Sequence, residues 1–114
     1  MPQPEQRQPT IFEKRVYNLI SKIPKGKVTT YKLLAEALNC NSAQAIGQAL
    51  KRNPYAPEVP CHRVIRTNLT LGGYAGELSG EKVIKKTKLL TEEGVHFDTD
   101  GMLITKNALL HSFK

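Results

Sequence analysis

The sequence predicts a mainly α-helical domain with a small β component, arranged as a winged-helix-like helix-turn-helix. Three observations support this: four segments have apolar residues at helical spacing, a short polar break separates the second from the third, and an Asp-Gly turn joins two short apolar runs. A chain of 114 residues, 39% of them apolar, has room for one hydrophobic core. We therefore expect one domain over residues 10–105, a flexible lead-in over 1–9 and a C-terminal tail over 106–114.

The first helix is expected over about residues 11–22. Thr10 and Glu13 form a capping-box pattern at its start, and Pro24 stops the run. Between them the apolar residues follow at helical spacing, namely Ile11, Phe12, Val16, Leu19, Ile20 and Ile23.

The second and third helices are expected to begin after the N-caps Thr30 and Ser42. The polar residues 39–41 separate them, and Asn53-Pro54 ends the third, which predicts a helix-turn-helix. The predicted inner faces are Leu33, Leu34, Ala37 and Leu38 on the second helix and Ala43, Ile46, Ala49 and Leu50 on the third. From these residues alone, an ordinary helical hairpin that binds no DNA is the commoner explanation.

A last amphipathic helix is expected to end at Gly94. Its predicted inward residues are Val83, Ile84, Thr87 and Leu90. The runs Val95–Phe97 and Met102–Ile104, joined through Asp100-Gly101, are predicted to pair as a small hairpin.

The chain is strongly basic, with a net charge of +7 and a pI near 9.6. Such a field attracts polyanions and favours nucleic acid as the partner, although a merely basic, solvated surface explains the charge nearly as well. The sequence shows neither a membrane span nor a secretory leader. We therefore expect no membrane partner and a cytoplasmic location, nucleoid-associated or nuclear depending on the source.

Cys61 and His62 are the residues whose chemistry is most distinctive. In a reducing compartment Cys61 and Cys40 are expected to be free thiols, and a thiol becomes a nucleophile only when a base removes its proton. His62 can reach Cys61 through a turn at Pro60 or a bridging water, and the acidic residues before Gly94 are candidates to orient the imidazole. A buried, inert cysteine is the simpler explanation of such a dipeptide.

The residues around Cys61 resemble the active-site domain of the O6-alkylguanine-DNA alkyltransferases. The resemblance runs from about Ile11 to Gly94 and rests on the segments GKVTTYKLLAEAL, the third helix, the NP turn, PCHRVI, a Gly-Gly-Tyr loop and LLTEEG, all in the family's order. The N-terminal domain that most members carry has no counterpart here.

The resemblance implies a once-only reaction in which Cys61 takes an alkyl group from O6 of guanine. It implies that His62 deprotonates Cys61 through a water, that Glu93 holds His62, and that Tyr31 donates to guanine N3. Asn53 corresponds to the asparagine that braces the turn beneath the active site, although it also suits a simple helix stop before Pro54.

The resemblance also implies duplex DNA containing O6-alkylguanine as the partner, bound through the minor groove with the base flipped out. The expected DNA-binding residues are Thr30, Tyr31, Ala43, Gln44, Ala45, Gly47, Gln48, Lys51 and Arg52, and the expected alkylguanine pocket is Tyr31, Val64, Gly73, Tyr74, Ala75 and Gly76. Gln44 stands where the family usually has an arginine, and Ala75 replaces a frequent hydroxyl residue. These departures put the strength of base flipping in doubt and make recognition of O6 depend on backbone N–H groups.

No cofactor and no metal are expected, because the two cysteines and three histidines lack the short spacings of a zinc site. We expect a monomer.

Two alternatives for the function remain open. The first is an alkyltransferase-like protein, which binds alkylated DNA without efficient transfer; those relatives typically carry tryptophan in place of the cysteine. The second is a Cys-His hydrolase, for which no oxyanion hole is apparent.

Overall fold

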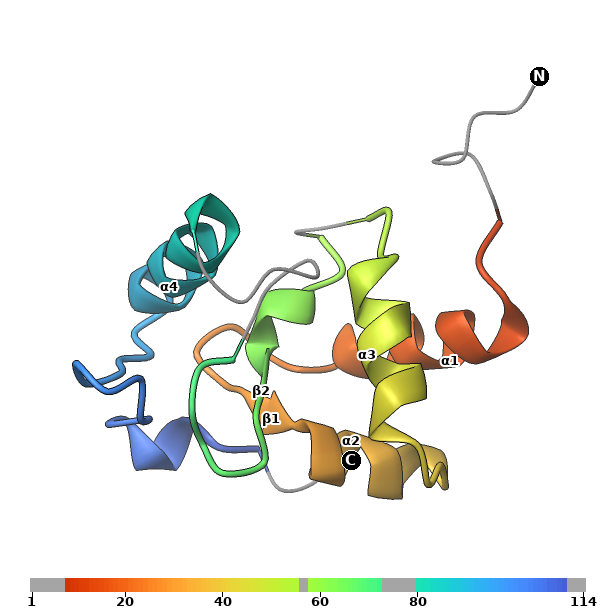
Figure 1. Cartoon of the computed structure of the whole chain (residues 1–114), viewed down its shortest axis with the longest axis horizontal. Helices are drawn as coiled ribbons and strands as arrows, with labels where there is room; N and C mark the ends of the chain where they lie inside the picture. The colour runs from red at the N-terminus through yellow and green to blue at the C-terminus, as the bar shows by residue number, and fades with distance from the viewer. Residues whose placement is uncertain (1–7, 56–57, 73–79, 111–114) are drawn as a thin grey trace.

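The computed structural model describes residues 8–55, 58–72 and 80–110. It is mainly helical with one small sheet, as the sequence predicts (Figure 1). In chain order its elements are α1 (Ile11–Ile20), β1 (Thr29–Thr30), α2 (Tyr31–Leu38), α3 (Ala43–Lys51), the 3₁₀ turn η2 (Cys61–Arg63), β2 (Val64–Ile65), α4 (Glu81–Glu92) and the 3₁₀ turn η3 (Lys106–Ala108).

The first helix begins as its capping box predicts and ends two residues early. Thr10 Oγ1 accepts from the N–H of Glu13 at 3.1 Å, and the Glu13 carboxylate accepts from the N–H of Thr10 at 3.0 Å. Beyond Ile20 the backbone bonds tighten to a three-residue spacing, which closes the helix before residue 22. Ile11 is 82% exposed, because it begins the helix on the side away from the core.

The helix-turn-helix is formed by α2 and α3. Thr30 and Ser42 cap the two helices, accepting from the N–H groups of Leu33 at 3.2 Å and Ala45 at 3.0 Å. Asn39 ends α2 in the left-handed conformation, with φ of 53°.

Two residues expected on the inner faces of these helices are exposed. Ala37 faces solvent because the side of α2 that packs on the core contains Leu34 and Leu38, with Ala35 partly buried beside them. Ala43 is exposed because the first turn of α3 projects beyond the core, which begins at Ile46.

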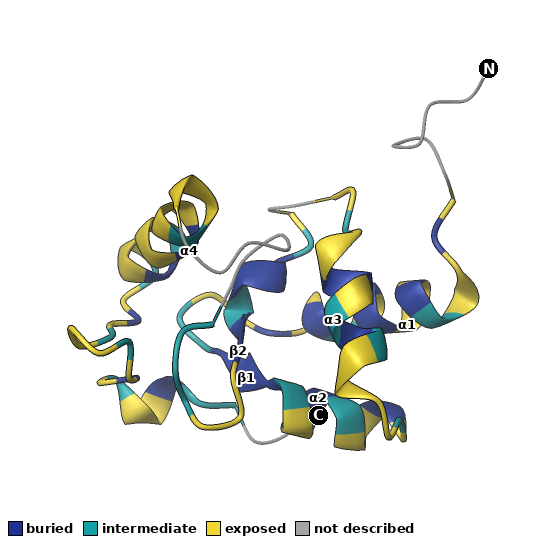
Figure 2. Ribbon diagram, in the orientation of Figure 1, coloured by how far each residue is buried: buried dark blue, intermediate teal, exposed yellow. Residues whose placement is uncertain are grey.

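A two-stranded parallel sheet joins the two halves of the molecule. Thr29 pairs with Val64 and Thr30 with Ile65. Successive residues of a strand face opposite sides, so Val64 packs in a cluster with α1, α2 and α3, whereas Ile65 packs in a second cluster with α4 and the C-terminal segment. Figure 1 shows the sheet between these halves, and Figure 2 shows it buried, together with η2.

The inward face of α4 differs from the predicted one. Ile84 is 68% exposed and Thr87 faces solvent, whereas Lys86 and Leu90 are buried. The helix is rotated toward Leu89 because the buried Lys86 ammonium group finds carbonyl acceptors on that side. In the described parts of the chain, no helix is long and apolar enough to cross a bilayer.

The C-terminal segment continues the fold through Leu110, past the predicted domain boundary at residue 105. The N–H of Val28 donates to Ala108 O at 2.9 Å, and the N–H of Leu110 donates to Val28 O at 2.7 Å. Upstream, Phe97 and Leu103 form an antiparallel bridge, which confirms the predicted pairing of these two runs. The lead-in 1–9 lies mainly outside the described residues.

Candidate active site

Cys61 lies at the centre of the molecule, at the start of η2. Pro60 precedes it, and the N–H of Arg63 donates to Pro60 O at 3.0 Å, which closes a turn of the kind that the sequence suggested as one of two ways to bring His62 to Cys61. The side chain is 7% exposed and packs with Val64 in the helical cluster. The turn places the thiol and the next two side chains in one compact region.

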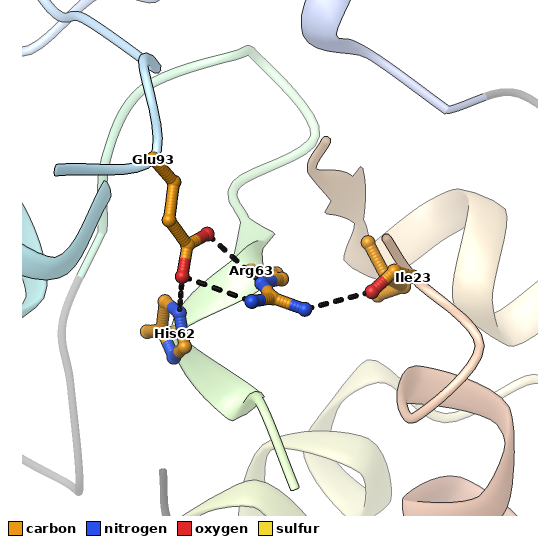
Figure 3. A network of polar contacts seen from close by, with 4 residues as sticks. All are labelled: Ile23, His62, Arg63 and Glu93. Carbon is orange, nitrogen blue, oxygen red and sulfur yellow. Dashed lines mark hydrogen bonds and ion pairs between the residues drawn. The ribbon is translucent and has the colours of Figure 1, made fainter. Parts of the chain in front are cut away.

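His62 is held by Glu93 from the far end of α4. His62 Nε2 lies 3.0 Å from Glu93 Oε2, across 31 residues of sequence (Figure 3). His62 is 2% exposed, and burial lowers its pKa although the hydrogen bond to Glu93 acts in the opposite direction. The imidazole is therefore neutral near pH 7.

The tautomer of His62 follows from the charge of its partner. An ionised carboxylate only accepts hydrogen bonds, so the proton of the neutral ring lies on Nε2, facing Glu93. Nδ1 is then the lone-pair atom, and it is buried without a hydrogen-bond partner among the described residues. This atom can accept a proton.

Arg63 keeps Glu93 ionised and in place. Its Nε donates to Oε1 and its Nη2 to Oε2, both at 2.9 Å, while Nη1 donates to Ile23 O at 2.8 Å (Figure 3). Burial by itself raises the pKa of Glu93, but hydrogen bonds from Arg63 and His62 lower it below its usual value. This role of Arg63 was not predicted from the sequence, where its position directly after Cys61-His62 was the available signal.

Tyr31 is the first residue of α2 and is half-buried. Burial raises the pKa of its hydroxyl and the charge of Cys61 raises it further, whereas the charge of Arg66 lowers it. Tyr31 is thus a protonated donor close to Cys61. Thr30 beside it is 3% exposed, and its hydroxyl is engaged as the cap of α2.

Lys86 is a second buried cation that the sequence analysis did not identify. It is 1% exposed, and its Nζ donates to Val64 O at 3.0 Å and to Leu71 O at 2.7 Å. Burial lowers its pKa to about 8, against the opposing effect of the Cys61 charge. Its spacing of four residues from Leu90 was the signal that it faces inward.

Asn53 braces the segment that leads to Cys61. Its Nδ2 donates to Val59 O at 2.8 Å, and its Oδ1 accepts from the N–H of Tyr55 at 2.9 Å. The contact with Val59 lies two residues before Cys61, so Asn53 fixes the backbone there.

The outer face of α3 carries small and polar side chains. Gly47 is on this face, and a Cβ added there would meet no atom within 4 Å, so internal packing does not require a glycine. Arg52 forms an ion pair of 3.6 Å with Glu13. The exposed residues of this region are Ala43, Gln44, Gln48, Lys51 and Arg52, while Ala45 and Gly47 are partly buried.

The expected alkylguanine pocket is described only in part. Val64 is buried next to Cys61, whereas Gly73, Tyr74, Ala75 and Gly76 lie outside the described residues. Cys40 follows the end of α2, and its Sγ contacts the backbone of Ser42. Within the described ranges, no group of three or more His, Cys, Asp and Glu residues is arranged to hold a metal ion.

Residues 11–95 match the family model described as the DNA-binding domain of 6-O-methylguanine DNA methyltransferase. A methylated-DNA–protein-cysteine methyltransferase of Candida glabrata is 37% identical over 106 residues, which cover 92% of this chain and 49% of that protein. The chain spans about half the length of the curated relatives it matches.

Two solved structures have the same fold. The O6-methylguanine-DNA methyltransferase of Pyrococcus kodakaraensis is 45% identical, with a TM-score of 0.66 over 75% of this chain and 47% of that one. Atl1 of S. pombe, in complex with damaged DNA containing O6-carboxymethylguanine, is 26% identical, with a TM-score of 0.68 over 91% of this chain and 98% of that one. With the family model matching most of its length, the chain belongs to the O6-methylguanine DNA methyltransferase family.

Proposed function

We propose that this protein repairs DNA by direct, irreversible transfer of an alkyl group from O6 of guanine in duplex DNA to Cys61. The observation that carries the proposal is the 3.0 Å contact between His62 and Glu93 beside the buried thiol. The curated relatives named methylated-DNA–protein-cysteine methyltransferase support the same reaction. The protein acts as a monomer and needs no cofactor.

The first step is removal of the Cys61 proton. His62 Nδ1 takes this proton through a bridging water, and the imidazole becomes a cation. Glu93 stabilises that cation through its bond to Nε2, while Arg63 keeps the carboxylate ionised. The buried, prearranged Glu93 and Arg63 favour this charge separation without reorganisation of solvent.

The second step is displacement at the alkyl carbon. The Cys61 sulfur forms a bond to that carbon as the bond from carbon to O6 breaks, and the electron pair passes to the purine. Tyr31 gives its hydroxyl proton to N3 of the departing guanine, so guanine leaves neutral, and the proton that His62 took from Cys61 restores the Tyr31 hydroxyl. The thioether left on Cys61 is stable, and each chain reacts once.

The DNA approach depends on the outer face of α3. The target atom is stacked inside the duplex, so the nucleotide is flipped out at a cost of roughly a few kcal/mol. The small residues Ala43, Ala45 and Gly47 let α3 approach the minor groove, Gln44 enters the gap left by the base, and Lys51 and Arg52 contact phosphates.

A second candidate function is binding of alkylated DNA without efficient transfer. The match with S. pombe Atl1, solved in complex with damaged DNA containing O6-carboxymethylguanine, covers 98% of that chain. Cys61, with His62 and Glu93 beside it, favours transfer over binding alone.

Mass spectrometry after incubation with an oligonucleotide containing O6-methylguanine tests the choice. We expect one added methyl group per chain, on the peptide that contains Cys61. Cys61→Ala should abolish transfer and keep DNA binding, while Cys40→Ala should retain both. Binding of the alkylated duplex with no mass change would favour the second candidate, and methylation at Cys40 or sustained turnover would contradict the proposed mechanism.

A further inference from the structure

The parallel strands bring Tyr31 and Arg66 side by side at the edge of the Cys61 site. Thr30 of β1 pairs with Ile65 of β2, so Tyr31 and Arg66 are the next residues beyond the paired strand ends. One residue further, the N–H of Lys32 donates to Thr67 Oγ1 at 3.2 Å. The start of α2 and the turn after β2 are therefore fixed to each other.

The Arg66 side chain is directed by two local contacts. Its N–H donates to Thr70 O at 3.0 Å, which closes the turn. A Cβ added at Gly72 would lie 3.1 Å from Arg66 Cγ and 3.5 Å from Nε, so the stem of the arginine rests against the Gly72 backbone. With φ of +74°, Gly72 also has a conformation that other residues rarely adopt. These contacts limit the positions that the guanidinium can take.

The charge of Arg66 acts on the active site and stabilises no contact among the described residues. It exerts an electrostatic effect on both Tyr31 and Lys86. The residue is exposed, and over the described ranges its guanidinium forms neither a hydrogen bond nor an ion pair. Arg66 is thus a positioned cation at the rim of the site, and none of the residues that the structure describes is its anionic partner.

We infer that Arg66 binds a backbone phosphate next to the nucleotide whose base enters the Cys61 site, and so positions that nucleotide. The inference rests on the proposed function. When the base lies against Tyr31 and Cys61, its sugar and phosphates remain at the exposed rim, where Arg66 is. The planar fork of an arginine fits phosphate oxygens bidentately. Arg66 thereby supplies a cation close to the flipped nucleotide, a charge that Gln44 lacks.

The test uses duplexes with O6-methylguanine in which one of the two linkages flanking the lesion is an uncharged methylphosphonate. With the methylphosphonate at one of these two linkages, the single-turnover rate of the unmodified protein should be about tenfold lower than on the ordinary duplex. A tenfold loss corresponds to about 1.4 kcal/mol, which is the size expected for a hydrogen bond to a charged group. Arg66→Ala should react about tenfold more slowly than the unmodified protein on the ordinary duplex. Its rate on the methylphosphonate duplex should be no lower than its rate on the ordinary duplex. Arg66→Lys should lie between the two, because it keeps the charge without the fork.

Lys106→Ala is the matched control, since it removes one exposed positive charge from η3, outside the site. It should keep the full methylphosphonate sensitivity, meaning the same fall in rate from the ordinary duplex to the methylphosphonate duplex as the unmodified protein. Reaction with free O6-benzylguanine, which has no phosphate, should fall much less in Arg66→Ala than reaction with the duplex, because only the electrostatic effect of Arg66 on Tyr31 is lost there. Full methylphosphonate sensitivity in Arg66→Ala would overturn the inference, as would equal losses on duplex and free base, which would mean that Arg66 acts on Tyr31 or on the fold.

Failure of the proposed function gives a different result. In that case the unmodified protein transfers nothing from the duplex or from free base. The affinities of the same variants for the ordinary duplex and for the methylphosphonate duplex are then compared by equilibrium binding. Loss of methylphosphonate sensitivity in Arg66→Ala alone would still support the phosphate contact, and retained sensitivity would overturn it.

Discussion

Lys86 Nζ donates a 2.7 Å hydrogen bond to the carbonyl oxygen of Leu71, which connects α4 to the segment that follows β2. The same ammonium group donates to Val64 O, three residues after Cys61. A buried lysine on α4 therefore holds β2 and the segment that follows it together. Its charge is costly there, because burial lowers its pKa from 10.5 to about 8.

This cost predicts a pH dependence of stability. Between about pH 8 and 10.5 the unfolded chain holds more protons on Lys86 than the folded one, so its contribution to the free energy of unfolding rises with pH. Compared with Lys86→Met, the unmodified protein should gain about 2 kcal/mol between about pH 7.5 and 9.5. Chemical denaturation at both pH values measures the difference, with the exposed Lys85→Met as control. A difference that is flat or falls with pH would refute the buried charge.

Thiol reactivity should follow the protonation of His62. Cys61 should react with iodoacetamide faster than Cys40 near neutral pH, and His62→Ala should remove the advantage. Since burial holds the pKa of His62 below 6.5, the advantage should persist at pH 6.5 and disappear as the pH falls through that lowered pKa. The two rates are measured by peptide mass spectrometry, after Cys40 is shown to be accessible in the folded protein. Equal rates at neutral pH would exclude an activated thiol.

The carboxylate of Glu93 should matter for both stability and reactivity. Glu93→Gln leaves the partly buried Arg63 without its counter-ion, and breaking such a pair costs about 3 kcal/mol. Denaturant unfolding should show this loss together with a slower reaction of Cys61. An unchanged unfolding midpoint would mean that the two hydrogen bonds from Arg63 to Glu93 contribute little to the stability of the fold.

Asn53 offers a substitution that separates its two hydrogen bonds. Asn53→Asp keeps an acceptor for the N–H of Tyr55 but removes the donor to Val59 O, whereas Asn53→Ala removes both. Each lost bond should cost about 1 kcal/mol. If the Val59 contact positions Cys61, both variants should slow alkyl transfer to a similar extent. Normal transfer by Asn53→Asp would limit Asn53 to a role in ending α3.

Gln44 tests how the duplex is opened. Gln44→Arg adds a cation in the minor groove, so the slope of log affinity against log salt should steepen by about one unit. Gln44→Ala should leave that slope nearly unchanged and slow repair in duplex DNA, because it removes a wedge without a charge. Neither change should affect reaction with free O6-benzylguanine. Equal impairment of Gln44→Ala on free base and duplex would show that Gln44 supports the fold instead.

The sequence by itself determined the local features of this protein. Helix starts at Thr10, Thr30 and Ser42 were predictable because a capping side chain bonds within three residues of itself. The family was predictable because PCHRVI and the segments before and after it stand in the family's order.

Only the tertiary structure decided the partners of Arg63 and Lys86. Arg63 reaches both Ile23 and Glu93, which are 40 and 30 residues away, and no local pattern encodes such a contact. Lys86 was missed for a related reason: a lysine on a short helix is usually solvated, and its burial depends on carbonyl groups that the folded chain brings to it. The rotation of α4 followed from the same contacts, since the position of a helix face is set by what packs against it.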